Sequence, residues 1–108
     1  GNATDVTQAG VKATAVADKT SANVGEKVKY TVTVSGTAGA DAENDTITLA
    51  ITGLSDATAL TPASGTNCTV SGLVITITAN DTATSGTFTV EGTVTGAVSA
   101  TLTGAAVS

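Results

Sequence analysis

The amino-acid sequence predicts an all-β fold, in which about seven to nine antiparallel strands pack as a sandwich. Valine and threonine alternate along several segments, which is the two-residue period of strands that have one buried and one exposed face. Turn-forming residues separate these segments. No segment carries a 3.6-residue apolar period, and the many β-branched residues disfavour helix.

The first half of the chain contains the clearest strand. Residues up to Asp18 are expected to form an edge strand with a break near Gly10. Residues 26–35 then alternate strictly, so we expect one face of that strand to lie in the core. The core-facing side chains are Val28, Tyr30, Val32 and Val34, and the exposed ones are Lys27, Lys29, Thr31 and Thr33.

Three further runs and a last strand follow. The apolar faces of the runs are Ile47, Leu49 and Ile51; Leu73, Ile75 and Ile77; and Phe88, Val90 and Val94. Only Ser71 and Gly72 separate two of the segments, which indicates a tight hairpin. Residues 98–102 are expected to form the last strand. This strand count is typical of immunoglobulin-like folds.

Size and charge restrict the class of protein. The chain has 108 residues, the size of a single domain, and we expect residues 1–108 to form one. The net charge is −5, and the four lysines form no basic stripe, which excludes nucleic acid and anionic membranes as expected partners. No apolar run approaches the roughly 20 residues of a spanning helix, so no membrane insertion is expected.

Composition also predicts where the protein resides. Low charge together with abundant threonine, alanine, glycine, serine and asparagine points to an extracellular, cell-surface setting. No signal peptide is present, and Gly1 is interpreted as a boundary in front of a mature domain. Cys68 is the single cysteine, so an internal disulfide is excluded.

One segment resembles a known family. Residues 21–34, Ser-Ala-Asn-Val-Gly-Glu-Lys-Val-Lys-Tyr-Thr-Val-Thr-Val, resemble the opening of the conserved-repeat immunoglobulin-like domains of bacterial and archaeal surface proteins, known as domain of unknown function eleven. In that family a Val-Gly-acid turn leads into a Val-x-Tyr-Thr-Val-Thr-Val strand. The likeness extends loosely through residues 45–54 and 85–90, and it implies an immunoglobulin-like fold and a surface setting.

The residue types disfavour catalysis. The chain contains no histidine, which removes the commonest general base and the commonest transition-metal ligand. Without a neighbouring histidine, Cys68 lacks a base that would generate its thiolate, and it is interpreted as a small buried hydrophobic residue. We therefore expect that the protein is not an enzyme and holds no cofactor, with calcium as the one alternative.

The calcium candidate is an acidic segment. Asp41, Glu43 and Asp45 offer hard oxygen ligands close together, as a calcium site requires. The segment lacks the spaced glycine and the terminal glutamate of an EF-hand loop. The alternative interpretation is a polar, solvated loop between two strands.

Two modification patterns are also present. Lys12, Lys19, Asn80 and Glu91 are the residue types of a lysine–asparagine cross-link with an acidic catalyst, although Glu91 is interpreted instead as an exposed strand residue. Asn-x-Thr sequons occur at Asn2, Asn44, Asn67 and Asn80, and a threonine-rich chain also produces such matches by chance.

These observations leave two functions open. The first is a non-catalytic structural or spacer module of a secreted microbial surface protein, whose partners are neighbouring domains of the same protein. The alternative is an adhesive or assembly module that binds a protein or glycan through loops or a sheet edge. Sugars stack on aromatic faces, and only Tyr30 and Phe88 are available, both on predicted core faces.

Overall fold

The fold consists entirely of antiparallel strands in the part of the chain that is described. The computed structural model describes residues 10–19, 21–60 and 64–104, and for 97–104 it describes the backbone alone. The strands are β1 (Val11–Ala17), β2 (Lys27–Thr37), β3 (Thr46–Ala59), β4 (Ser64–Gly65), β5 (Cys68–Ser71), β6 (Val74–Ile77) and β7 (Ala83–Gly104). No helix occurs in these ranges. The predicted all-β class is therefore confirmed.

The strands form one curled sheet. Its order is β1-β2-β7-β3-β6-β5-β4, with seven strands joined by hydrogen bonds. The sequence predicted a sandwich of two sheets, whereas here the same strands run through both halves of the structure. The prediction of a separate last strand at residues 98–102 is wrong. These residues form a strand, but they continue β7, which is 22 residues long.

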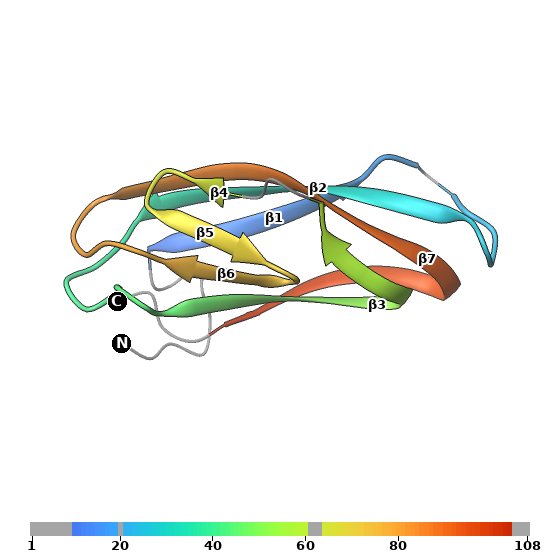
Figure 1. The fold of residues 1–108 in the computed structure, drawn as a ribbon. Coiled ribbons are helices and arrows are strands. Elements are labelled where there is room, and N and C mark those ends of the chain that lie inside the picture. Colours follow the sequence, from blue (N-terminus) through green and yellow to red (C-terminus); the bar gives the residue numbers. More distant parts are fainter. Residues whose placement is uncertain (1–9, 20, 61–63, 105–108) are drawn as a thin grey trace.

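A sharp bend in β3 and β7 produces the curl. The first part of β7 pairs with β2, from Thr37↔Ala83 to Lys27↔Thr93. Residues 90–104 of β7 pair with β3, and the register there changes from Leu54↔Val94 to Thr52↔Ser99. Gly53 lies at this corner with a φ of 81°, a left-handed conformation that glycine adopts without a Cβ clash. Figure 1 shows both strands turning back at one end of the molecule, so that the two halves of the sheet face each other.

The core lies between the two halves. All four predicted core residues of β2 are buried, and the intervening side chains from Lys27 to Thr33 are exposed. Ile47 and Leu49 from β3, Ile75 and Ile77 from β6, and Phe88, Val90 and Val94 from β7 join them in one buried cluster. Ile51 and Leu73 are half-buried and pack against it. The alternation of the sequence therefore predicted the core faces correctly.

The predicted hairpin joins β5 to β6. Ser71 pairs with Val74, so the two loop residues are Gly72 and Leu73, one position later than predicted. Gly72 has a φ of 61°. Glycine is the preferred residue at the first loop position of a type II′ turn, whose twist matches that of the strands.

The short strand β4 returns to β7 and closes one side of the sheet. Beyond β4, Thr66 and Ser85 exchange two backbone hydrogen bonds of 2.7 and 3.1 Å. The backbones approach so closely here that a Cβ at Gly65 would overlap the carbonyl oxygen of Ser85. The approach therefore requires glycine at position 65, and it leaves β1 as the open edge among the described strands.

Candidate functional sites

The acidic segment 41–45 forms part of a clasp between two loops at one end of the sheet. The Glu43 amide donates to Asn80 Oδ1 over 2.7 Å. The Asn44 amide donates to the carbonyl of Ile77, and the Ile77 amide donates to the carbonyl of Asp45. Ala42 is fully buried beneath the loop. These contacts fix the backbone of the segment against residues 77–80.

The clasp does not gather the three predicted calcium ligands into a metal site. Asp41 and Glu43 are exposed, whereas Asp45 is half-buried at the start of β3. In residues 10–19, 21–60 and 64–104, no group of three or more histidine, cysteine, aspartate or glutamate side chains could hold a metal ion. The clasp holds the segment through its backbone amides and carbonyls, and such contacts do not require the carboxylates to converge. The geometry therefore favours the alternative of a polar loop.

Cys68 is buried, as expected for a small apolar residue. Its side chain is 3% exposed, and Sγ lies 3.5 Å from the carbonyl oxygen of Ser85. Burial raises the pKa of the Cys68 thiol. A thiol with a raised pKa forms little thiolate, so Cys68 is expected to react slowly in the folded protein.

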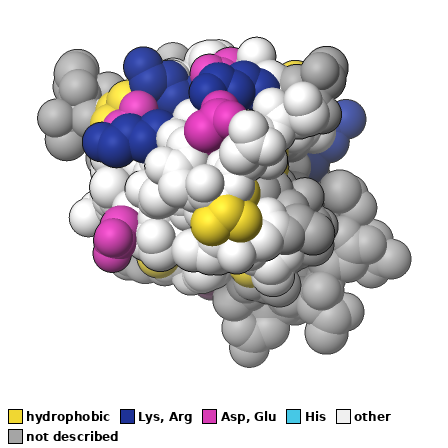
Figure 2. Space-filling model, turned by 90° about the vertical axis from the view of Figure 1, so that its right-hand side faces the viewer, with side chains coloured by type: hydrophobic (Ala, Val, Ile, Leu, Met, Phe, Trp, Pro, Cys, Tyr) yellow, Lys and Arg dark blue, Asp and Glu magenta, His cyan; other side chains and the backbone are white. Residues whose placement is uncertain are grey.

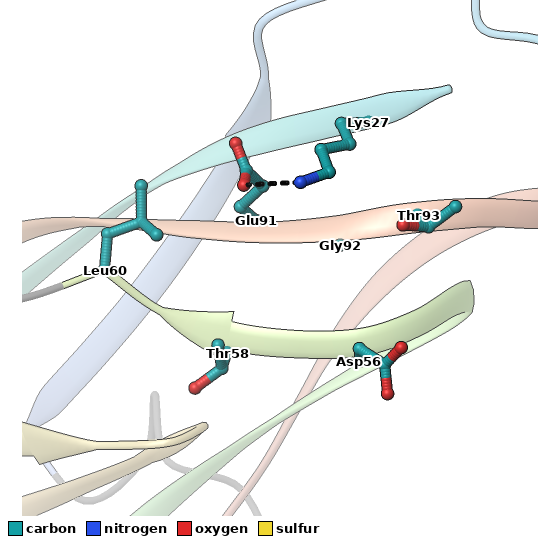
Figure 3. Close-up of a pocket in the computed structure, with 7 residues that line it drawn as sticks. All are labelled: Lys27, Asp56, Thr58, Leu60, Glu91, Gly92 and Thr93. Carbon is teal, nitrogen blue, oxygen red and sulfur yellow. Dashed lines mark ion pairs between the residues drawn. The ribbon is translucent and has the colours of Figure 1, made fainter. Parts of the chain in front are cut away.

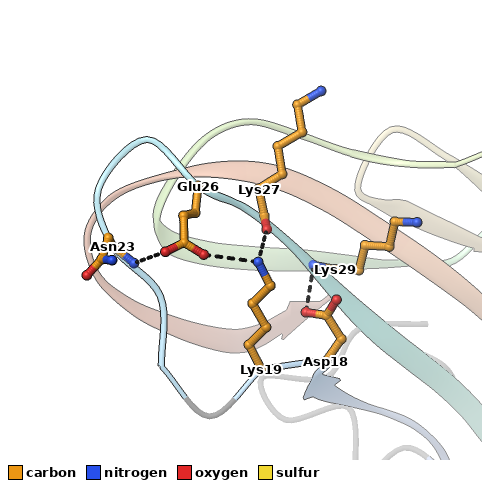
Figure 4. A network of polar contacts seen from close by, with 6 residues as sticks. All are labelled: Asp18, Lys19, Asn23, Glu26, Lys27 and Lys29. Atoms are coloured by element: carbon orange, nitrogen blue, oxygen red, sulfur yellow. Dashed lines mark hydrogen bonds and ion pairs between the residues drawn. The ribbon is translucent and has the colours of Figure 1, made fainter.

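A second cluster of polar contacts fixes the loop between β1 and β2 (Figure 4). Glu26 accepts from the Asn23 amide through Oε1 and from Lys19 Nζ through Oε2, each over 3.1 Å. Lys19 also donates to the carbonyl of Lys27. The backbone hydrogen bond from Asn23 and then the Lys19 ammonium lower the pKa of Glu26. Glu26, the acidic residue of the Val-Gly-acid turn, therefore stabilises the loop between β1 and β2.

A shallow pocket of about 200 Å³ lies on the outer face of β2, β7 and β3. Its lining residues are Lys27, Asp56, Thr58, Leu60, Glu91, Gly92 and Thr93. Lys27 Nζ lies 3.9 Å from Glu91 Oε1, and Lys29 Nζ lies 4.0 Å from Glu91 Oε2. Figure 3 shows the Lys27 and Glu91 side chains directed toward each other across the strands.

The pocket offers little chemistry. The Glu91 side chain is only 27% exposed, because two lysines flank it, whereas the Lys27 side chain is 72% exposed. Such solvent-screened pairs contribute at most about 1 kcal/mol. No histidine or aromatic ring lines the pocket. Figure 2 shows that charged side chains gather along one side of the end-on face, while most of the rest of the described surface is neither charged nor hydrophobic.

The residues considered for a lysine–asparagine cross-link engage in separate contacts. Lys19 binds Glu26, Asn80 accepts from the Glu43 amide, and Glu91 lies beside Lys27 and Lys29. Lys12 lies on β1, where it pairs in register with Ser35. The described contacts therefore do not assemble a lysine, an asparagine and an acid in one place.

The sequons differ in accessibility. Asn67 is half-buried, and its Nδ2 donates to the carbonyl of Ala83 over 2.9 Å. Asn44 and Asn80 are exposed, and Asn2 lies outside the described residues. Asn44 and Asn67 have φ values of 70° and 60°, which identify both as turn residues. The amide nitrogen of Asn67 is thus engaged within the fold.

Comparison with known proteins adds no relative. No family model, curated protein or solved structure matches the chain. Within the described residues, no helix is long and apolar enough to cross a membrane.

Proposed function

We propose that this chain is a non-catalytic spacer module of a secreted microbial cell-surface protein, with its curled sheet packed as an immunoglobulin-like sandwich. Its partners are the neighbouring domains of the same protein. A spacer holds other domains at a distance and needs a stable body with an evenly polar exterior.

The exterior of the sheet carries this proposal. Apart from Gly36, the exposed positions of β2 are occupied by lysine and threonine, and Thr87 and Thr95 continue this pattern on β7. Among the described residues, the exposed large hydrophobic side chains are Val16 in β1, Val24 in the loop between β1 and β2, and Leu60 directly after β3. Surfaces that bind proteins usually present a contiguous apolar patch of several hundred Å².

The spacer proposal is tested by binding. The folded chain is screened against glycans, matrix proteins and cell-wall polymers, with calcium and then with a chelator. We expect no saturable binding in either condition. Saturable binding to one class would replace the spacer with an adhesive module, and loss of that binding on chelation would restore Asp41, Glu43 and Asp45 as calcium ligands.

The sandwich packing has its own test. Nuclear Overhauser contacts are expected between methyl groups of Val32 in β2 and Ile75 in β6, because both belong to the buried cluster. Val16, which is 67% exposed, serves as the control and should show no contact with Ile75. A structure in which the two halves of the sheet splay apart would exclude the sandwich.

A second function, assembly through a sheet edge, is favoured by the position of β1. It is the first strand in the sheet order, and among the described strands its one neighbour is β2. An edge strand presents backbone groups that can pair with a further strand.

A further inference from the structure

The free edge of β1 is complementary to itself, and we propose that it pairs antiparallel with β1 of a second copy of this chain. The proposal names the partner for the edge-assembly function and rests on that second function. It is independent of the spacer function, which needs no contact between copies.

The first step is to identify which backbone groups face outward. The Asp18 amide donates to the carbonyl of Lys29, and the Thr37 amide donates to the carbonyl of Gly10. Both pairs fit the β1–β2 register, in which Ala13 lies opposite Val34. In an antiparallel ladder, alternate residues exchange hydrogen bonds with one neighbour. The even-numbered residues of β1 therefore bond to β2, and Val11, Ala13, Ala15 and Ala17 direct their amides and carbonyls to the free edge.

The side chains divide in the same way. Lys12, Thr14, Val16 and Asp18 are exposed on the outer face, while the alanines at 13, 15 and 17 face the core side. Val16 is the apolar member of this outer face and is 67% exposed. A partner strand at this edge would cover it.

In one antiparallel register, the segment 12–18 is complementary to the same segment of a second copy. When Ala15 lies opposite Ala15 of the second copy, Lys12 lies opposite Asp18, and Thr14 lies opposite Val16. Each of these unlike pairs occurs twice, once on each side of the twofold axis, as an isologous interface requires. All inward-facing pairs are alanine with alanine.

The geometry of this register favours the contacts. Ala13, Ala15 and Ala17 become the hydrogen-bonded pairs, because their backbone groups face the edge. The even-numbered residues become non-hydrogen-bonded pairs, in which the side chains lie closest. Lys12 forms no ion pair within the described part of the chain, and Asp18 uses Oδ1 to accept from the Lys29 amide over 3.2 Å. Opposite charges placed directly across a strand pair stabilise the pairing.

Charge complementarity supports a second copy of this chain as the partner of the β1 edge. The chain carries a net charge of −5, so copies repel one another at long range, and a specific contact must bring opposite charges together. The lysine–aspartate pairs of this register do so. A single strand edge buries less area than a standard interface, so the association is expected to be weak and to weaken further in salt.

The experiment is sedimentation of the whole chain over a wide concentration range. The wild type should change reversibly from the 10.3 kDa monomer to twice that mass. Lys12→Glu alone and Asp18→Lys alone should each remain monomeric, because each places like charges opposite one another. A mixture of the two variants should form a heterodimer, because both cross-strand pairs are then of opposite charge. Lys27→Glu, which makes the same charge change on β2, should dimerise as the wild type does.

A second measurement tests the backbone contacts without a charge change. Ala15→Pro removes an amide that faces the free edge and leaves the β1–β2 hydrogen bonds intact. It should abolish dimerisation. In concentration-dependent NMR spectra of the wild type, the amides of Ala13, Ala15 and Ala17 should shift, and those of Thr14 and Val16 should shift less.

Three results would overturn the proposal. They are a chain that stays monomeric at all concentrations, a dimer that Ala15→Pro leaves unchanged, and a mixture of Lys12→Glu with Asp18→Lys that fails to associate. None of them bears on the spacer function, since that function is judged by binding to other molecules. Saturable binding to an external ligand would exclude the spacer and leave the edge pairing to be judged by sedimentation.

Discussion

The side-chain amide of Asn67 donates a 2.9 Å hydrogen bond to the carbonyl of Ala83, the first residue of β7. This contact joins the residue before β5 to the start of the central strand. It lies next to the Thr66–Ser85 backbone pair, so the return of β4 to β7 is held by both side-chain and backbone contacts.

Asn67 is expected to stabilise the fold in two ways. Asn67→Gly removes the side-chain hydrogen bond but tolerates the φ of 60°, and it should lower the free energy of unfolding by about 1 kcal/mol. Asn67→Ala also loses the local hydrogen bonding by which asparagine tolerates a positive φ, which costs up to about 1–2 kcal/mol, so its loss of stability should be larger. Urea denaturation measures both. Asn44→Ala is the control, because it carries the φ penalty alone. The assignment would be contradicted if Asn67→Gly and Asn67→Ala lost equal stability, or if Asn67→Ala were as stable as the wild type.

Gly65 is expected to be irreplaceable for steric reasons. A Cβ at this position would overlap the Ser85 carbonyl oxygen, so Gly65→Ala should cost about 1–3 kcal/mol through displacement of the backbone. Gly96, also in the described chain, has open space where a Cβ would lie. Gly96→Ala should therefore leave stability within about 0.5 kcal/mol of the wild type or raise it slightly. Thermal denaturation that ranks the two variants in the opposite order would refute this explanation.

Glu26 is expected to make stability depend on acid pH. Its pKa is lowered in the folded state by the Asn23 amide and Lys19, so the ionised form contributes stability above the ordinary glutamate pKa. That contribution is lost as the pH falls through the lowered pKa. Melting temperatures of the wild type and Glu26→Gln should therefore differ near neutral pH and converge in acid. Glu43→Gln, a change in an exposed loop, is the control; a difference that grows in acid would contradict the assignment.

Cys68 is expected to react only when the chain unfolds. The thiol is buried and its pKa is raised, so alkylation by iodoacetamide at mildly alkaline pH should be slow in the native protein. Addition of denaturant should accelerate it in step with global unfolding, since no thiolate is presented by the folded state. Mass spectrometry measures the labelled fraction. Rapid stoichiometric labelling of the native chain would show that β5 opens locally.

The alternation of the sequence predicted which side chains are buried, and it did so best in β2. Val28, Tyr30, Val32 and Val34 face the core there. Successive side chains of a strand point to opposite faces, and only one face of this strand is apolar, so its orientation is determined. The continuity of β7 could not be predicted, since glycines at 92 and 96 resemble turn signals. In the fold, Gly92 is buried against Leu54, and Gly96 lies where the strand bends.

The local sequence pattern could not predict which distant strands pair with each other. Whether β7 joins one sheet or two depends on hydrogen bonds to β2 and β3, which are far away in sequence. The acidic segment illustrates a related point. Asp41, Glu43 and Asp45 are close along the chain, but the clasp holds this segment to Asn80 through a backbone amide, and among the described residues no three acidic side chains form a group that could hold a metal ion.

The central place of β7 has a consequence for how the chain can be made. β7 follows the other six described strands in the sequence, yet it lies between β2 and β3 in the sheet. Without it, the described order separates into a β1–β2 pair and a β3–β6–β5–β4 group whose strands are not neighbours. A nascent chain therefore exposes the valines of β2 and the isoleucines of β3 until β7 has left the ribosome, and the core closes only once that strand is available.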